Sequence, residues 1–500
     1  MNTDLIKTEG ELAEIADFLS EELAAVKSEN AVSRFSRNIT DSLSFANGKR
    51  IGGLNVQTNI NKEMMDRGIY TTTCTDDFSP NNFSEVAVAR DLQNQRFIFH
   101  QKGVPLPVEN YTFIDDIPSN IDIFDEEIQQ FTKEHKNSVM KRILSVEQRI
   151  VVNSKGGIAV QSIPFFGISY SYGYSPIPTY RDITVVCTND DEIKRLPSLI
   201  KYLADPTPDR RIKRSNTFDG AFHELYKISG LRFGSLEEAG IPLRELYDVV
   251  MLNGVPIHEI FGHHFEEPIR HLNFGESGTF KNGQIIKNKD LIITDNPKQK
   301  LNGFRVLGFT NFDAYGRLRI ARENIKDGII SEFLGSEYAD PINLKRFLNI
   351  EKCFYVGSAS QPIDGMFPQP RMSCTVLDGK TENVDLEGKI LIVPLGGHTR
   401  SEDKTYMVNG HECYVVRDGE PKRVIPLKVT GGINQALANI SLLNETSYQV
   451  GTCGKPEPIC SMGTADAAVS QVAKSQPWRG QQVYPLPISE AHLKILQNIR

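Results

Sequence analysis

The sequence predicts an α+β fold, with an N-terminal α/β domain whose helices pack on a sheet and a β-rich C-terminal domain. Two patterns support this class. Helical and β-rich segments do not alternate strictly along the chain, which disfavours a doubly wound α/β sheet. After about residue 270 the helical pattern gives way to short β-rich runs that Gly, Asn and Asp residues separate.

The N-terminal half contains segments of both types. Residues 9–28 predict an amphipathic helix because apolar side chains recur there at helical spacing. These side chains are Leu12, Ile15, Leu19, Leu23 and Val26. Alternating or β-branched runs predict strands over residues 51–70 and 85–101, and residues 124–146 predict a helix that leads into a strand.

A predicted hairpin follows at residues 149–174. Its two β-rich arms flank Asn153–Gly157, whose Asn, Ser and Gly residues favour a tight turn. Beyond it, residues 204–216 are polar and hold two Pro and four basic residues, which is typical of a solvated linker. The sequence therefore predicts two domains, residues 1–210 and residues 211–500.

The C-terminal half begins with a helical pattern that extends to about residue 270 and then becomes strand-rich. A Gly pair opens a short predicted helix over residues 431–443. The predicted strands cover residues 291–294, 304–310, 389–394, 412–417 and 422–429.

The composition narrows the class of function. The chain has 500 residues, of which 63 are acidic and 56 basic, and its net charge is −7. This acidic balance gives no electrostatic support for nucleic-acid binding. No apolar run reaches the roughly 18 residues of a membrane span, and the acidic N-terminus lacks the pattern of a signal peptide. We therefore expect a cytoplasmic protein without a nucleic-acid or membrane partner.

One segment combines metal-binding side chains at short spacing. His258 and Glu259 are followed by His263 and His264. In hydrolytic zinc sites two imidazoles bind the ion, and the carboxylate beside the first imidazole activates a water molecule. The usual spacing places the second His four residues after the first, whereas here it comes five residues later.

The extra residue has a geometric consequence. On a regular helix a residue at i+5 lies about 140° around the axis from residue i, so His258 and His263 could not share one ion. A π turn adds one residue to a helical turn and realigns these positions, and such turns concentrate at functional sites. Gly262 lowers the cost of the deformation. The spacing is therefore either a zinc motif with one inserted residue or a coincidence.

A catalytic zinc site also needs a third protein ligand. Nearby candidates are His264, Glu266 and Glu267. Distant candidates are the seven cysteines, because their small and odd number argues against a disulfide framework. Among them, Cys453 lies in the segment Gly-Thr-Cys-Gly-Lys, where glycines allow a close backbone approach and the lysine favours the thiolate.

With these residues the chain resembles the TldD/PmbA family of zinc metallopeptidases over roughly residues 125–460. The elongated His-Glu-x-x-x-His motif of that family corresponds to residues 258–263, and its Gly-x-Cys-Gly-Lys segment corresponds to residues 451–455. Three weaker matches lie outside these segments. They are the Asn-Ser-x-Gly turn at residues 153–156, the Phe-Asp-x-x-Gly stretch at residues 312–316 and the Pro-Arg-Met stretch at residues 370–372.

The resemblance implies a function and a set of ligands. His258, His263 and Cys453 hold Zn²⁺ on this reading, and Glu259 is the general base. The implied activity is zinc-dependent hydrolysis of peptide bonds in unfolded peptides or small protein substrates, with the zinc helix in the C-terminal domain. The implied assembly is a homodimer or a heterodimer with a related chain.

Three alternatives remain open. A non-catalytic zinc-binding or scaffold subunit of a TldD/PmbA-type heterodimer is disfavoured because such relatives typically lack the His-Glu motif. A thiol enzyme based on Cys453 leaves the histidines unexplained, and a structural zinc site would not need Glu259. His264 stands where the family usually has Gly and could compete with His263, and the roles of Cys374 and Cys460 stay open.

Overall fold

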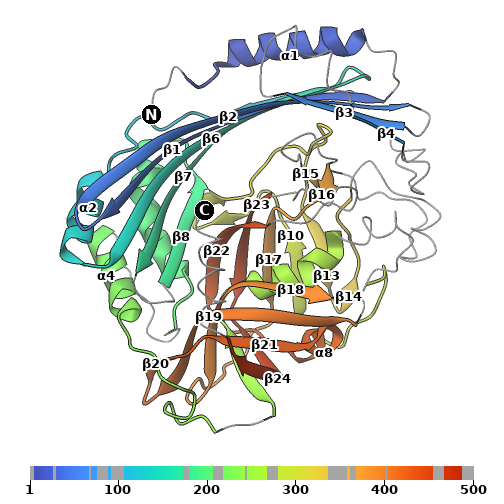
Figure 1. The fold of residues 1–500 in the computed structure, drawn as a ribbon. Coiled ribbons are helices and arrows are strands. Elements are labelled where there is room, and N and C mark those ends of the chain that lie inside the picture. The colour runs from blue at the N-terminus through green and yellow to red at the C-terminus, as the bar shows by residue number, and fades with distance from the viewer. Residues whose placement is uncertain are drawn as a thin grey trace.

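The structure is a computed structural model, and it confirms the α+β class: long strands form most of the molecule, with helices at its edge and one inside the C-terminal half (Figure 1). The residues it describes are 5–25, 30–66, 69–75, 88–91, 106–172, 179–206, 218–242, 245–266, 280–335, 357–360, 368–400, 403–453 and 467–486. Among the described helices, none has the length and apolar character needed to cross a membrane.

A long curved sheet dominates the N-terminal half and arches over the rest of the molecule (Figure 1). Its strand order is β11-β12-β8-β7-β6-β1-β2-β3-β4, and β5 pairs in parallel with β7. The strands are β1 (Ala31–Ala46), β2 (Lys49–Asp66), β3 (Ile69–Thr75), β4 (Val88–Asp91), β5 (Asn110–Ile114), β6 (Ser138–Asn153), β7 (Ile158–Tyr172), β8 (Thr179–Val186), β11 (Lys300–Leu301) and β12 (Phe304–Val306). Of the strand predicted over residues 85–101, only β4 falls within the described residues.

The predicted hairpin around Asn153 is present as β6 and β7. The Asn153 side chain accepts hydrogen bonds from the backbone N–H groups of Lys155 (2.9 Å) and Gly157 (3.3 Å). Gly156 has φ +89°, a conformation that L side chains rarely adopt. Gly157 is required for a different reason, since a Cβ there would lie 2.2 Å from the carbonyl oxygen of Pro107.

Helices cover one face of this sheet. α1 (Glu9–Ala24) begins with a capping box between Thr8 and Glu11, and its apolar stripe packs against Phe35 and Ile150. The helix predicted over residues 9–28 is therefore confirmed as far as Ala24. Further along the sheet lie α2 (Asp125–Glu134), α3 (Asp190–Arg195), the 3₁₀ helix Leu196–Tyr202 and α4 (Phe218–Ser229). All four helices bury apolar side chains in one core with strands β6 to β8, and α3 contributes a single residue to it.

Two six-stranded sheets form most of the C-terminal half, in the orders β14-β13-β10-β17-β23-β22 and β18-β9-β24-β21-β19-β20. Their strands are β9 (Tyr247–Met251), β10 (Leu291–Asp295), β13 (Arg322–Lys326), β14 (Ile329–Ile330), β17 (Cys374–Gly379), β18 (Ile390–Arg400), β19 (Thr405–Arg417), β20 (Glu420–Val424), β21 (Leu427–Gly432), β22 (Thr446–Cys453), β23 (Ala467–Lys474) and β24 (Gln476–Pro485). The short strands β15 (Ala359–Ser360) and β16 (Gln369–Pro370) pair separately, and α8 (Ile433–Asn439) matches the predicted short helix.

Two predicted elements differ from the structure. The helical pattern expected up to about residue 270 is interrupted by β9, whose buried Val249 and Val250 pair with both β18 and β24. Burial on both faces favours a short apolar strand over a helix here. The strand expected over residues 304–310 ends at Val306. Gly308 has φ +85°, which is not a strand conformation, and a Cβ at this position would lie 2.2 Å from the carbonyl oxygen of Ser373.

The helix that follows β9 runs between the two C-terminal sheets. It consists of α5 (Val255–Ile257), the π turn His258–Gly262 and one further helical turn to Glu266. Ile257, Ile260, Phe261 and Phe265 pack in the core that both sheets share. This burial fixes the orientation of the opposite side of the helix, where the histidines lie.

A buried ion pair joins the two halves of the chain. Arg181 on β8 donates from Nη1 to Glu412 Oε1 on β19 at 2.6 Å, and both side chains are only 1% exposed. Arg181 also donates to the carbonyl of Ala204, and Tyr414 donates to Glu412. The division predicted near residue 210 stays a prediction, because residues 207–217 lie outside the described part.

We predict that Glu412→Gln lowers the free energy of unfolding by about 3–5 kcal/mol, because it leaves a buried guanidinium without its counter-charge. Burial alone would raise the pKa of Glu412, but Arg181 lowers it below the usual value. The stability from the ionised carboxylate is therefore present above the unfolded-state pKa and is lost as the pH falls through the lower folded-state pKa. Urea unfolding at neutral and acidic pH measures both effects.

The matched control is Glu323→Gln, which breaks an ion pair with Lys326 of similar length whose side chains are about half exposed. This change should cost less than about 1 kcal/mol. Equal losses in the two variants would contradict a structural role for the buried pair.

Candidate metal centre

The start of the helix after β9 is held in place by side-chain hydrogen bonds. Asn253 accepts from the backbone N–H of Val255 and donates to the carbonyl of Pro394 on β18 (2.9 Å). Gly254 lies so close to β23 that a Cβ there would stand 2.6 Å from the Cβ of Gln471. These contacts fix where the first histidine, His258, enters the site.

Of the two interpretations that the spacing left open, the structure has the geometry of the first, a π turn. Residues His258–Gly262 form a π helix, and the extra residue brings the rings of His258 and His263 to a centroid distance of 4.8 Å. Gly262 contributes in a way that the sequence did not reveal. Its φ is not positive, but a Cβ there would lie 2.3 Å from Met372 Sδ, so the position needs Gly for close packing.

Four potential ligand side chains meet on this side of the helix. One ligand atom each of His258, Glu259, His263 and Cys453 lies within 4.8 Å of all the others. His263 Nε2 is 3.3 Å from Cys453 Sγ and 3.3 Å from Glu259 Oε2. Cys453 comes from the end of β22, so the fold joins residues 190 positions apart in the chain.

The outer nitrogens of both histidines are bound by neighbouring side chains. His258 Nδ1 lies 2.9 Å from Thr375 Oγ1, and His263 Nδ1 lies 2.9 Å from Glu266 Oε2. These contacts direct the Nε2 atom of each ring towards the cluster. His258 Nε2 is buried and has no hydrogen-bond partner in the described part of the chain, which is the state expected of a nitrogen that serves as a metal ligand.

Arg371 connects the cysteine strand with the histidine helix. Its Nη2 donates to the carbonyl oxygen of Cys453, and its Nη1 lies 3.8 Å from Glu266 Oε2. The guanidinium is almost fully buried, and its charge opposes those of Glu266 and the Cys453 thiolate. The next residue, Met372, donates from its backbone N–H to Glu266 Oε1 at 2.6 Å.

The electrostatics of the cluster favour a thiolate. Burial alone would raise the pKa of Cys453, but the adjacent imidazoles of His263 and His258 lower it to about 5 against the opposing charge of Glu259. The described cysteines away from the cluster behave differently. Burial raises the pKa of Cys374 and Cys413 to about 12. The lowered pKa favours the thiolate form of Cys453, which is the form that binds a metal ion.

The other predicted candidates lie elsewhere. Glu266 binds the outer nitrogen of His263, and the ring of His264 packs edge-on against Phe280 at 5.3 Å. Cys374 lies in the core beside β8. Glu267 and Cys460 fall outside the described residues, as does Lys455.

The sequence did not identify the residues that support the cluster. Thr375 carries no local signal, and Arg371 stood out only as part of the Pro-Arg-Met stretch. The Phe-Asp-x-x-Gly stretch supplies another support. Asp313 accepts from the backbone N–H groups of Tyr315 and Arg317, and this loop leads to Arg319, which donates to the carbonyl of Arg371 at 2.6 Å.

Comparisons with known proteins agree with this geometry. Residues 247–465 match the family described as the PmbA/TldA metallopeptidase C-terminal domain. No curated protein matches the sequence. The fold is similar to that of TldE from Thermococcus kodakarensis, with a TM-score of 0.59 at 13% identity over 94% of this chain and 99% of that one.

Two further solved structures share the fold. A candidate modulator of DNA gyrase from Bacteroides thetaiotaomicron has a TM-score of 0.60 at 12% identity, over 96% of this chain and 100% of its own. A similarly described protein from Thermotoga maritima has a TM-score of 0.56 at 15% identity, over 95% and 100%. At such low identity these matches show the fold and nothing further.

We predict that Gly262→Ala destabilises the protein by about 1–3 kcal/mol, because the added methyl group must displace the sulfur of Met372, which also accepts a hydrogen bond from Thr375. Thermal or urea unfolding of the full chain measures this effect. Gly451→Ala is the matched control, since a Cβ there would meet nothing within 4 Å and the residue lies on the cysteine strand. An unchanged stability of Gly262→Ala would show that the Met372 contact does not constrain the turn.

Proposed function

Because the chain belongs to the PmbA/TldD metallopeptidase family, we propose that it is a zinc-dependent peptidase that hydrolyses peptide bonds in unfolded peptides or small protein substrates. The observation that carries this proposal is the convergence of His258, Glu259, His263 and Cys453. Three of these side chains would hold the ion, and the fourth would remain available for proton transfer.

The donor set fits zinc. His258 and His263 offer two imidazole nitrogens and Cys453 offers a thiolate, a combination that favours zinc over the oxygen-preferring Mg²⁺ and Ca²⁺. Three protein ligands leave one position of a tetrahedral ion open, which is typical of catalytic rather than structural zinc. When bound, zinc supplies Lewis acidity, which lowers the pKa of water and polarises a carbonyl group.

Glu259 is suited to the role of general base. Its carboxylate lies on the π turn, 3.3 Å from His263 Nε2. Because the Glu259 side chain is 20% exposed, solvent and substrate can reach it. It would accept a proton from the attacking water and deliver that proton to the leaving amine. Glu266, which is 1% exposed and bonded to His263, is a positioning residue.

One competing function has an observation in its favour. The 3.3 Å contact between Cys453 Sγ and His263 Nε2 resembles the thiol–imidazole pair of a cysteine enzyme. A chelator separates the two readings, because it should abolish a zinc peptidase and leave a thiol enzyme active. A non-catalytic subunit remains the third possibility, and it would show neither activity.

The proposal extends to the setting of the protein. We propose an assembly as a homodimer or as a heterodimer with a related chain, and an unfolded peptide as the partner at the site. A reducing cytoplasmic location fits a working thiolate and the free state of the described cysteines Cys187, Cys374, Cys413 and Cys453.

We predict that Glu259→Gln keeps about one zinc per chain but loses peptidase activity by at least about 100-fold, because the ligands remain and the base is lost. Metal analysis and hydrolysis of an unfolded peptide measure the two effects. Glu224→Gln is the matched control, since Glu224 also follows a histidine on a helix but lies on the surface beside Lys227. Full activity of Glu259→Gln would contradict the proposed role of Glu259 as general base.

The third ligand has its own test. Cys453→Ser should lose zinc, whereas Cys187→Ser, a change at a buried thiol near the end of β8, should retain it. Full metal occupancy in Cys453→Ser would remove this residue from the ligand set.

A further inference from the structure

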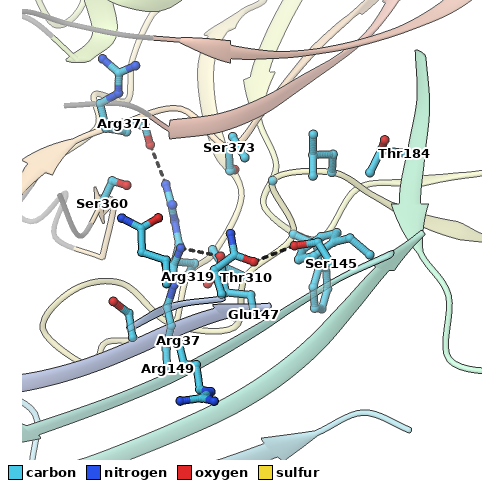
Figure 2. A pocket seen from close by; sticks show the side chains of 18 of the residues that line it. Arg37, Ser145, Glu147, Arg149, Thr184, Thr310, Arg319, Ser360, Arg371 and Ser373 are labelled. Atoms are coloured by element: carbon cyan, nitrogen blue, oxygen red, sulfur yellow. Dashed lines mark hydrogen bonds and ion pairs between the residues drawn. The ribbon is translucent and has the colours of Figure 1, made fainter. Parts of the chain in front are cut away.

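A cavity of about 400 Å³ lies between the N-terminal sheet and the C-terminal half. Figure 2 shows the side chains that line it. The helix-free face of β6 forms one wall, through the alternate residues Ser145, Glu147 and Arg149. The loop after β12 and the segment Arg371–Ser373 form the opposite wall. Nothing proposed above for the function uses this space.

The segment Arg371–Ser373 lies between the cavity and the residues proposed to bind the metal ion. Met372 lines the cavity, yet its N–H donates to Glu266 and its Sδ packs on Gly262 of the π turn. Arg371 borders the same space, while its guanidinium extends to the carbonyl of Cys453. A ligand in the cavity would therefore be separated from the reacting groups of the proposed peptidase by this one segment of chain.

The charged groups facing the cavity are unequal in sign. Arg149 on β6 and Arg319 after β12 present two guanidiniums, and Glu147 presents one carboxylate (Figure 2). Arg37 also borders the space, but its guanidinium binds the carbonyl oxygen of Leu5 and Oγ1 of Thr58 instead. Arg371 lines the space too, but its guanidinium lies at Glu266 and the carbonyl of Cys453, so two cationic groups and one anionic group face the cavity.

The carboxylate already present is fully engaged. Glu147 Oε2 accepts from Arg149 Nη2 at 2.7 Å, and its Oε1 accepts from Gln161 Nε2 at 3.1 Å. No other hydrogen bond of the Arg149 guanidinium is seen within the described ranges. Arg149 therefore keeps N–H groups that a ligand in the cavity could use.

Arg319 is buried, and its contact with the acidic side chain of Asp295 is a long one. Its Nη2 donates to the carbonyl of Arg371 and stands 3.8 Å from Asp295 Oδ2, which is long for an ion pair. The other oxygen of Asp295 is committed to three donors, the N–H and Oγ of Ser373 and the N–H of Cys374. Burial is the main cause that lowers the pKa of Arg319; the charges of Asp295, Asp313 and Glu266 oppose this effect, and that of Arg149 adds to it.

We propose that this cavity binds a carboxylate group of the peptide substrate between Arg149 and Arg319. A carboxylate offers two acceptors to two converging guanidiniums, and charge-assisted hydrogen bonds of this kind are the strong ones. It would also remove the repulsion between the two arginines. The inference rests on the proposed peptidase function and adds to it a preference for peptides with an acidic side chain or a free C-terminus at one fixed distance from the cleaved bond.

The experiment measures peptide affinity separately from hydrolysis. Zinc-loaded full-length Glu259→Gln is titrated, by fluorescence anisotropy, with labelled ten-residue unfolded peptides. One series moves a single Glu through an otherwise neutral sequence and pairs each peptide with its Gln analogue. A second series compares the free C-terminal acid with the amide. We expect one position, or the C-terminus, at which the carboxylate tightens binding about 10- to 100-fold.

Three further variants, each in the Glu259→Gln background, identify the site. Arg149→Gln should abolish the preference for the carboxylate without weakening the neutral peptide, and Arg319→Lys should reduce it. Arg149 is about one-quarter exposed, so its replacement should leave the fold intact. Arg37→Gln is the matched control, because it removes the same charge from a guanidinium that is bound outside the cavity, and it should keep the preference.

The outcomes separate the two proposals. Equal affinity for every acidic and neutral pair, or a preference that survives Arg149→Gln, would overturn the cavity proposal even if the wild-type chain hydrolyses peptides. A carboxylate preference that depends on Arg149, in a chain whose wild type hydrolyses no peptide, would support the cavity and contradict the peptidase.

Discussion

The candidate site depends on one backbone feature, the π turn at His258–Gly262. On a regular α-helix the rings of His258 and His263, five residues apart, would point to different sides of the helix. With the π turn they stand 4.8 Å apart, and Glu259 lies beside them. The turn is tightly supported, because the apolar side of the helix is buried between two sheets and Gly262 packs directly on Met372.

The remaining parts of the site are held by polar contacts that converge on this turn. Thr375 on β17 and Glu266 at the end of the helix bind the outer nitrogens of the histidines. Arg371 links the carbonyl of Cys453 to Glu266, so the strand that supplies the thiolate and the helix that supplies the imidazoles share one guanidinium. The same segment closes the cavity under the N-terminal sheet, which places the proposed carboxylate site and the proposed metal ligands on two sides of one short stretch of chain.

Much of this arrangement was accessible from the sequence, and the limits have physical reasons. The spacing of two histidines identified a π turn as the condition under which they could share an ion, because helix geometry is local. The hairpin at Asn153 and the helix at residues 9–24 followed from equally local patterns. The approach of Cys453 depended on family resemblance, since no local rule brings two segments 190 residues apart together. Thr375 and Arg371 were not recognised as supports, because their partners lie on other strands, and Gly262 was assigned conformational freedom when its actual constraint is steric.

The most direct test of the account is anomalous diffraction at the zinc absorption edge from crystals of the zinc-loaded protein. The account predicts a single strong peak between Nε2 of His258, Nε2 of His263 and Sγ of Cys453, with Glu259 beside it but not required as a ligand. The absence of a peak between these atoms in zinc-loaded crystals, or a peak elsewhere in the chain, would contradict the assignment of the metal centre on which the proposed chemistry rests.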